Sequence, residues 1–418
     1  MQNKRTFISF VGKGHLSKNE KPEYLPTAYD FGNNVLCSCR CFAEAVRKSG
    51  NFNFDEVVFI GTDTSSWSAL LESCEENEFE LWSKLFEQEQ AEKPLTPEDC
   101  SKLQAVLSNL WGKPARLAVH AAELLAENCT DILNRYVAEI FAAGNDILLD
   151  ITHSFRWMPL LLTSAMQYKN AFGIENCKFE IIYGEYRQNA ASPVRWVNEL
   201  VEGQEVADAI ALFFQKFEAA QLAAKLQPYW ERGADIIKNL AIHLQGNYFL
   251  PLLFNPQKEN FPASDLLNQL KNQLHKFDSG LQPVWVKEVH KNLQNIYQQL
   301  TVDDPTDRLL NLAEILSERK LYGQAVTCIC LAVEQWVLQY FGAVKHPGYE
   351  KLQDLKEKIK TEVSYKESSI FRKIQELRNQ VAHGGLPDSP VSTNPATLQE
   401  NYKKLQQQFI NLKKSINK

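Results

Sequence analysis

The feature of this 418-residue sequence that most constrains its fold is that short strand-like runs are confined to the first half. The four clearest are RTFISFVG (5–12), EVVFIGT (56–62), NDILLDI (145–151) and KFEIIYGEY (178–186). Continuous apolar runs of this kind are typical of strands buried on both faces of a parallel sheet. Helix-like stretches such as 33–50 and 157–173 separate them. We therefore predict an α/β, doubly wound, Rossmann-like fold with a mostly parallel sheet.

Strand-like runs disappear after about residue 200, and the chain continues as helical stretches interrupted by the polar segments 254–264 and 301–308. The length suits two domains better than one. We predict a Rossmann-like sensor domain over residues 1–200 and an all-α region over 201–418, so the fold class is α/β plus all-α. The segment 67–140 is expected to be mostly helical, as an insertion or a long crossover.

Composition narrows the class of protein. The net charge of −6 does not suit a nucleic-acid coat, but residues 391–418 hold five lysines and one acid. This local excess predicts either a surface for a phosphate backbone or a solvated helix face. No apolar run has the length of a membrane span, and the N-terminus lacks the features of a signal peptide. We expect a cytoplasmic protein without a membrane partner.

The cysteines predict neither a metal nor a redox site. There are nine, and no pair has C-x-x-C spacing. The stretch CSCRC (37–41) has the wrong spacing for a zinc knuckle. If this stretch is helical, Cys37 and Cys41 share a face, which favours buried, reduced thiols.

One stretch of the first half, ILLDITHSFRWMP (147–159), has the character of a ligand-binding loop. A buried strand ends at Asp150, and an apolar helix with Pro159 in its first turn follows. Ligands of open α/β sheets bind beyond the carboxyl ends of the strands, and free N–H groups at a helix start favour anions. The polar candidates for a phosphate-rich ligand are Asp150, Thr152, His153, Ser154 and Arg156.

Other strand ends are expected at the same crevice. Their candidate residues are Gly12, Lys13 and Gly14 after the first strand, Thr62, Asp63 and Thr64 after the second, and Tyr183 at the end of the fourth. The sequence contains neither G-x-G-x-x-G nor a G-x-x-x-x-G-K-[ST] phosphate loop, so a dinucleotide site is not indicated. The alternative reading is that Asp150, Thr152 and His153 only cap the helix and satisfy the turn.

The second half contains a catalytic candidate, RNQVAHGG (378–385). An apolar stripe at helical spacing precedes it, and the two glycines end the predicted helix. Arg378 and His383 are roughly 140° apart on a regular helix, so one helix does not easily complete a site. Two copies facing each other across a two-fold axis would, which predicts a homodimer or a higher oligomer.

The chemistry that these residues suit is metal-independent cleavage of RNA, in which a 2′-hydroxyl attacks the adjacent phosphate. His383 would act as general acid or base, Arg378 would stabilise the charge that develops on the phosphate, and Asn379 would orient the phosphate or the imidazole. The alternative is a surface arginine and a helix-terminal histidine that interacts with the helix dipole.

Together the two motifs resemble a known family. DITHSFR after a buried strand resembles the DxTHG-motif CRISPR-associated proteins, whose sensor is a Rossmann-like CARF domain. RNQVAH in a helical domain resembles the R-x-x-x-x-H motif of HEPN ribonucleases. The chain is similar to the CARF–HEPN accessory ribonucleases of type III CRISPR systems, in the Csx/Csm group. Ser154 stands where the family has glycine, which bears on how closely a phosphate approaches the backbone.

The resemblance implies a homodimer that binds a cyclic oligoadenylate, with cyclic tetra-adenylate as the expected ring, and then cleaves single-stranded RNA without any cofactor. Asp150, Thr152, His153 and Arg156 would lie at or beside the ring, and Arg378 with His383 would form the catalytic pair. The main alternative is a non-catalytic cyclic-nucleotide sensor that dimerises or recruits a partner through its helices. A ligand-controlled transcription factor ranks lower, because no convincing basic helix-turn-helix is found.

Overall fold

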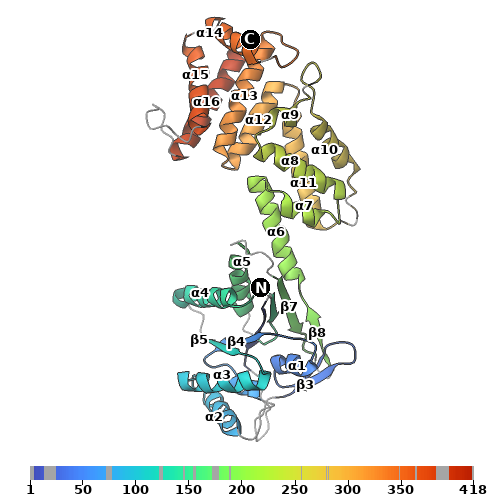
Figure 1. Cartoon of the computed structure of the whole chain (residues 1–418), viewed down its shortest axis with the longest axis vertical. Coiled ribbons are helices and arrows are strands. Elements are labelled where there is room, and N and C mark those ends of the chain that lie inside the picture. Colours follow the sequence, from blue (N-terminus) through green and yellow to red (C-terminus); the bar gives the residue numbers. More distant parts are fainter. Residues whose placement is uncertain are drawn as a thin grey trace. The chain divides into compact units, whose positions relative to one another are not determined.

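The computed structural model describes residues 4–13, 25–71, 78–121, 126–144, 146–153, 157–171, 178–187, 190–255, 257–278, 280, 282–347, 349–362, 365–382 and 395–416. The chain divides into two compact units, Met1–Gly203 and Gln204–Lys418 (Figure 1). We call them the sheet unit and the helical unit. None of the helices in the described part of the chain has the length and apolarity needed to cross a membrane.

Among the described residues, the sheet unit contains eight strands in the order β3-β2-β8-β7-β6-β1-β4-β5. Their bounds are β1 (Arg5–Val11), β2 (Thr27–Asp30), β3 (Leu36–Cys39), β4 (Glu56–Thr62), β5 (Ala115–His120), β6 (Asp146–Asp150), β7 (Lys178–Gly184) and β8 (Ser192–Trp196). Five of the neighbouring pairs are parallel, and β2–β3 and β7–β8 are antiparallel. The prediction of a mostly parallel sheet is confirmed, and the four predicted strands are β1, β4, β6 and β7.

The segment 67–140 is mostly helical, as predicted, and it also contains β5, which pairs with β4. One prediction for this unit is wrong in part. The helix expected over 33–50 begins late: Leu36–Cys39 is β3, antiparallel to β2, and only Phe42–Ser49 forms helix α1. Pairing with Thr27–Asp30 decides the conformation of the CSCRC stretch, and no local sequence pattern reports that pairing. Its three cysteines, Cys37, Cys39 and Cys41, form no disulfide within the described part of the chain.

Helices cover both faces of the sheet. Helix α1, the 3-10 helix η1 (Trp67–Leu71), α2 (Phe79–Gln90) and α3 (Pro97–Trp111) pack on the face that carries Phe7, Phe59 and Leu148. Helices α4 (Ala126–Ala142) and α5 (Trp157–Ala171) pack on the face that carries Ile8, Val58 and Leu149 (Figure 1). Successive residues of each central strand therefore enter different cores, which is why these strands are apolar throughout.

The order of the strands creates a crevice beside β1. After β1 and the β2–β3 ribbon at the far end of the sheet, the chain forms β4 and β5 on one side of β1, and then returns to β6 and β7 on the other side. The connections on the two sides of β1 therefore diverge at its carboxyl end. In open α/β sheets this reversal point is where ligands bind.

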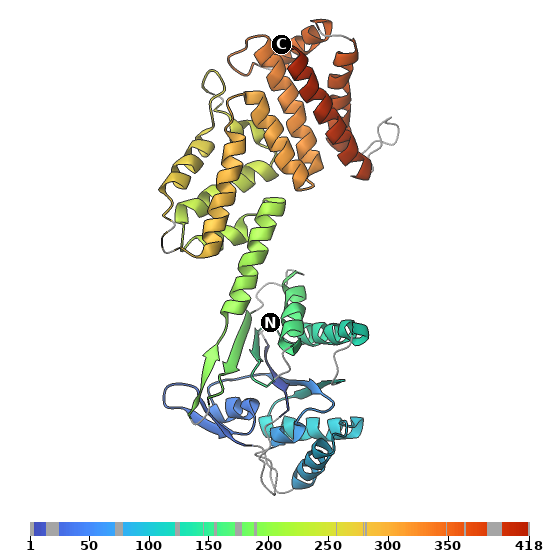
Figure 2. The ribbon, with the colours of Figure 1, turned by 180° about the vertical axis from the view of Figure 1, so that it is seen from behind.

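The helical unit contains eleven helices in its described part, the first of which begins just before the boundary between the units. They are α6 (Glu199–Lys216), α7 (Ala220–Leu226), α8 (Glu231–Gln245), α9 (Phe249–Leu253), α10 (Asp265–Lys276), α11 (Val284–Leu300), α12 (Pro305–Glu318), α13 (Tyr322–Tyr340), α14 (Tyr349–Glu362), α15 (Tyr365–Ala382) and α16 (Pro395–Ile416). Helix α13 packs against α12, α14, α15 and α16 (Figure 2). It is the core helix of this end of the unit because apolar side chains leave it in nearly every direction.

Candidate functional site

The turn after β6 is held by hydrogen bonds to both neighbouring strands. Asp150, fully buried, accepts a hydrogen bond from the Ser9 hydroxyl of β1 (2.6 Å) and another from the Thr152 backbone N–H (2.8 Å). The Thr152 hydroxyl oxygen accepts the Gly184 N–H at the end of β7 (2.8 Å). Asp150 and Thr152 therefore satisfy the turn, which is the role that the simpler of the two readings assigns to them.

The environment of Asp150 also changes its protonation. Burial raises the pKa of this carboxyl from its usual 3.8 to about 6, although the hydrogen bonds from Ser9 and Thr152 act in the opposite direction. Removal of the carboxylate from water disfavours its charged form more than the hydrogen bonds from Ser9 and Thr152 favour it. The carboxylate is therefore close to titration near neutral pH.

His153 of this turn is partly exposed. Its Nε2 atom and the Tyr29 hydroxyl of β2 are 3.0 Å apart, so the ring is held by a strand that precedes it by more than a hundred residues. Burial raises the pKa of Tyr29, so its hydroxyl is a neutral hydrogen-bonding group. A Cβ atom at Gly12 would lie 3.1 Å from the His153 backbone carbonyl, so the close approach of these two loops favours glycine.

A cavity of about 840 Å³ lies over this turn. It opens at the carboxyl ends of β1, β6 and β7, and residues of β2 and α1 complete its walls. The volume is within the roughly 300–1,000 Å³ of pockets that enclose small-molecule ligands. Its position is the one that the strand order predicts for a ligand site.

The structure brings only some of the predicted ligand residues to this cavity. Those that line it are Gly12, Lys13, Thr152, His153 and Tyr183. Asp150 lies in the turn that forms the cavity floor and is itself fully buried. Gly14, Ser154 and Arg156 lie outside the described residues.

Thr62, Asp63 and Thr64 do not line the cavity. Thr62 is fully buried: its N–H donates to the Ser65 hydroxyl (2.9 Å), and its carbonyl accepts the indole N–H of Trp67 (2.8 Å). The backbone of Asp63 bonds to His120 at the end of β5, on the other side of β4 from the crevice. From this loop, Ser66 lines the cavity, and its N–H donates to the Gly12 carbonyl (2.9 Å).

Several lining residues were missed by the sequence reasoning. Tyr29, Arg40 and Cys41 come from the β2–β3 ribbon and the start of α1, and Tyr186 follows β7. Arg40 adds a cation to a site for which the sequence predicted Lys13 and Arg156. Arg40 is the arginine of the CSCRC stretch, and the sequence does not connect it with the site because the pairing of the β2–β3 ribbon with β8 is not predictable from local pattern.

The catalytic candidates belong to helix α15. Ile374 and Leu377 are buried against the core of the helical unit, and the Cys330 thiol of α13 donates to the Ile374 carbonyl (3.6 Å). Burial raises the pKa of Cys330 to about 12, so the group is a neutral thiol. The predicted apolar stripe therefore packs on α13 as expected.

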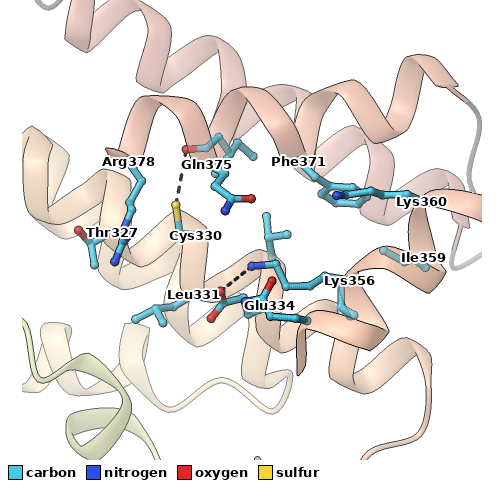
Figure 3. Close-up of a pocket in the computed structure, with 14 residues that line it drawn as sticks. Thr327, Cys330, Leu331, Glu334, Lys356, Ile359, Lys360, Phe371, Gln375 and Arg378 are labelled. Atoms are coloured by element: carbon cyan, nitrogen blue, oxygen red, sulfur yellow. Dashed lines mark hydrogen bonds and ion pairs between the residues drawn. The ribbon is translucent and has the colours of Figure 1, made fainter. Parts of the chain in front are cut away.

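Arg378 and Asn379 are exposed one turn before the helix ends at Ala382. Arg378 lies at the edge of that stripe, beside α13 and α14, whereas Asn379 lies on the opposite side. The guanidinium of Arg378 donates to the side-chain oxygen of Asn379 (3.2 Å). His383 and the two glycines after it lie outside the described residues. Arg378 also forms one end of a pocket bounded by α13, α14 and α15 (Figure 3).

Two charged residues of this unit form ion pairs within the fold. Glu334 of α13 pairs with Lys356 of α14 (2.9 Å). Lys413, counted in the basic C-terminal segment, is buried and pairs with Asp304 (2.9 Å) and Asp307 (2.6 Å) at the start of α12. It stabilises a helix end and does not form part of a basic surface.

The described residues contain no group of three or more His, Cys, Asp or Glu side chains placed to hold a metal ion. The geometry thus defines an α/β unit with a ligand-sized cavity at its strand ends, joined in one chain to a helical unit that exposes an arginine and an asparagine.

Comparison with known proteins adds one relative. The chain is 22% identical to the CRISPR-associated protein MJ1674 of Methanocaldococcus jannaschii over an alignment of 453 residues, which takes in 99% of this chain and 66% of the relative. The chain thus spans just under two thirds of that protein. No protein-family model matches.

Among solved structures, Enterococcus italicus Csm6 bound to cyclic hexa-2′-fluoro-hexa-dAMP aligns over 98% of this chain and 94% of its own. The identity is 12% and the TM-score 0.34. A TM-score this low gives the likeness no weight for the fold or function of this chain.

Proposed function

We propose that this protein is an endoribonuclease of type III CRISPR antiviral defence that a cyclic oligoadenylate activates. The observation that carries the proposal is the cavity of about 840 Å³ at the ends of β1, β6 and β7, with His153 of the DITH motif at its wall. The similarity to a relative named as CRISPR-associated supports the same biological setting.

The cavity suits a ring of adenylates. Lys13 and Arg40 provide cations for phosphates, and Tyr183 and Tyr186 provide aromatic surface for bases. Cyclic tetra-adenylate is the ring that we expect.

The proposed reaction takes place in the helical unit. The RNA 2′-oxygen attacks the adjacent phosphorus, its proton passes to a base, and the 5′-oxygen leaves with a proton from an acid. His383 carries out the proton transfer, and Arg378 stabilises the charge on the phosphate through paired hydrogen bonds. Asn379, which accepts a hydrogen bond from Arg378, orients that guanidinium or the phosphate. No metal takes part.

A homodimer completes the site in this proposal. On a regular helix Arg378 and His383 would be roughly 140° apart, so each active centre draws on both copies in this proposal. The ring shifts the population of active dimers because it binds the active arrangement more tightly than the resting one.

The first experiment measures cleavage of a labelled single-stranded RNA in EDTA, with cyclic tetra-adenylate, cyclic hexa-adenylate or no ring. His383→Ala and Arg378→Ala should abolish the ring-dependent cleavage. Arg372→Ala is the matched control, because Arg372 is an exposed arginine on the same helix that pairs with Glu376 (3.4 Å). It should retain activity.

Cleavage that needs a ring, tolerates EDTA and is lost in the two active-site variants supports the proposal and identifies the ring. Cleavage that depends on a metal, or that survives in His383→Ala, contradicts the mechanism. Ring binding without any cleavage would identify the protein as a sensor.

A further inference from the structure

The pocket beside Arg378 has the size of one flat ring system. Its volume is about 190 Å³, whereas pockets that enclose whole small-molecule ligands measure roughly 300–1,000 Å³. A complete nucleotide therefore does not fit inside, but a single base does. Figure 3 shows Arg378 and Thr327 at one end of the pocket, with Phe371 and Ile359 at the other.

The walls of the pocket combine an apolar base with a polar rim. Phe371, Ile374 and Ile359 are buried, and the Phe371 ring lies 5.8 Å from that of Trp336, which fixes its position. Glu334, Gln353 and Gln375 contribute a carboxylate and two amides. A single-stranded RNA base is recognised by this combination, in which an aromatic or apolar surface contacts its face and polar groups read its edge.

The charged residues of the pocket favour a phosphate outside it and a base inside it. Arg378, Lys356 and Lys360 surround the pocket, which favours a polyanion nearby. Between them lies the carboxylate of Glu334, with its side chain 23% exposed and its Oε1 atom paired with Lys356 (Figure 3). A phosphate inside the pocket would meet this carboxylate, whereas an N–H group of a base could donate to its second oxygen.

We propose that this pocket receives one base of the single-stranded RNA substrate, next to the phosphate that Arg378 contacts. The inference rests on the proposed function and adds a subsite that determines sequence preference. Glu334 accepts a hydrogen bond from the exocyclic amino group of the base, Gln353 and Gln375 bond to the remaining edge, and Lys356 positions Glu334. Adenine, guanine and cytosine carry such an amino group, so uracil is disfavoured at this position.

The test maps the cut sites of the ring-activated protein on an RNA pool with random bases around one cleavable position. The parent protein should disfavour uracil at one position adjacent to the cut. Glu334→Gln replaces one carboxylate oxygen, an acceptor, by an NH2 group, which is a donor. This variant should reduce the discrimination against uracil by about tenfold. Gln375→Trp, a substitution at an exposed position, should fill the pocket and remove the preference while the unit stays folded.

Glu314→Gln is the matched control. Glu314 lies on the neighbouring helix α12, is exposed, and accepts a hydrogen bond from Gln406 of α16 (2.9 Å), outside the pocket. It loses the same charge from the same unit and should keep the parent preference. An unchanged preference in Glu334→Gln and Gln375→Trp would overturn the proposal, as would a parent protein without base preference beside the cut.

A second readout separates this proposal from the proposed function. Fluorescence anisotropy measures binding of short labelled single-stranded oligodeoxynucleotides, which lack the 2′-hydroxyl and therefore cannot be cleaved by 2′-hydroxyl attack. If the parent protein cuts no RNA, the nuclease assignment fails. The binding measurement then tests the base pocket independently of cleavage. Weaker binding of oligo-dU than of oligo-dC, lost in Glu334→Gln, supports the base pocket, and equal binding refutes it.

Discussion

Tyr29 and Tyr136 each hydrogen-bond a histidine ring in the sheet unit, but they differ in what surrounds them. The Tyr29 hydroxyl lies 3.0 Å from His153 Nε2 at the wall of the cavity. The Tyr136 hydroxyl lies 2.9 Å from His120 Nε2 in the core formed with α4. Burial raises the pKa of both tyrosines, so neither hydroxyl ionises near neutral pH. The Tyr136–His120 pair, which does not line the cavity, therefore serves as a control for the Tyr29–His153 pair.

Tyr29→Phe is expected to weaken binding of the cyclic oligoadenylate by about five- to tenfold, because the His153 ring loses the bond that orients it. Tyr136→Phe should leave ring affinity unchanged. Each variant should lose about 1 kcal/mol of folding free energy. Calorimetric titration gives the affinities, and denaturant unfolding gives the stabilities. Equal ring affinity in the two variants would show that the Tyr29–His153 bond has no part in binding.

Asp150 makes the stability of the sheet unit depend on pH. Its pKa is raised by burial to about 6 in the folded protein, against a usual value of 3.8. The stability that the protonated acid contributes is fully present below about pH 3.8 and is lost as the pH rises through about 6. The span amounts to about 3 kcal/mol. Glu56 and Asp99 have lowered pKa values, so the stability that their carboxylates contribute is lost as the pH falls.

Asp150→Asn isolates the contribution of this one group, because the amide stays neutral. The stability of the variant relative to the parent protein should rise between pH 4.5 and pH 7.5, by about 2 kcal/mol. Denaturant unfolding at the two pH values measures it, with Asp146→Asn at the other end of β6 as the control. A relative stability that falls over this range would mean that Asp150 is ionised in the folded state throughout.

At the scale of elements, helix α15 positions the proposed catalytic residues by burying one side. Ile374 and Leu377 are 3% and 2% exposed, while Arg378 and Asn379 face solvent. The sequence predicts this arrangement well, because burial on one side of a helix leaves a period of 3.6 in the pattern. The short strands β2, β3 and β8 at one end of the sheet have no comparable pattern, and the sequence did not predict them.

Ile374→Ala is expected to destabilise the helical unit by about 2–5 kcal/mol, since it removes buried methyl groups and leaves a cavity against α13. It should also reduce RNA cleavage, because α15 is held less firmly under Arg378. Lys373→Ala, at the exposed neighbouring position, should alter stability by less than about 0.5 kcal/mol. Denaturant unfolding followed by a cleavage assay tests both statements. A stable Ile374→Ala variant would contradict the packing described for α15.

At the scale of the whole molecule, each unit has cores of its own. The two cores of the sheet unit draw on residues between Phe7 and Val201, and the core of the helical unit draws on residues between Ala209 and Leu412. Units with separate cores are expected to unfold as separate cooperative steps. A ligand that binds to one unit should therefore raise the unfolding transition of that unit alone.

Calorimetric unfolding should show two transitions, and a cyclic oligoadenylate at a hundred times its dissociation constant should add about 2.7 kcal/mol to the stability of the sheet unit. Ile374→Ala identifies the transition of the helical unit, because it lowers that one. Tyr29→Phe should reduce the shift caused by the ring. A ring that raises only the transition lowered by Ile374→Ala would place its site in the helical unit.

The sequence by itself determined the features that depend on local periodicity. The four central strands, the helices after residue 200 and the buried side of α15 follow from apolar patterns, because burial of a strand or a helix face leaves a regular spacing of apolar residues. The turn after β6 was also predicted, since a polar motif directly follows a buried strand. The roles of Arg378, Asn379 and His383 stay predictions.

Only the tertiary structure decided which residues share the cavity. Thr62 and His153 both follow strands, yet Thr62 ends β4 beyond the crevice and is enclosed by its own loop. Tyr29 and Arg40 precede His153 by more than a hundred residues and reach the cavity because β2 pairs with β8, which in turn pairs with β7. Strand pairing between distant segments leaves no periodic signal in one sequence, so its consequences for the site appear only in three dimensions.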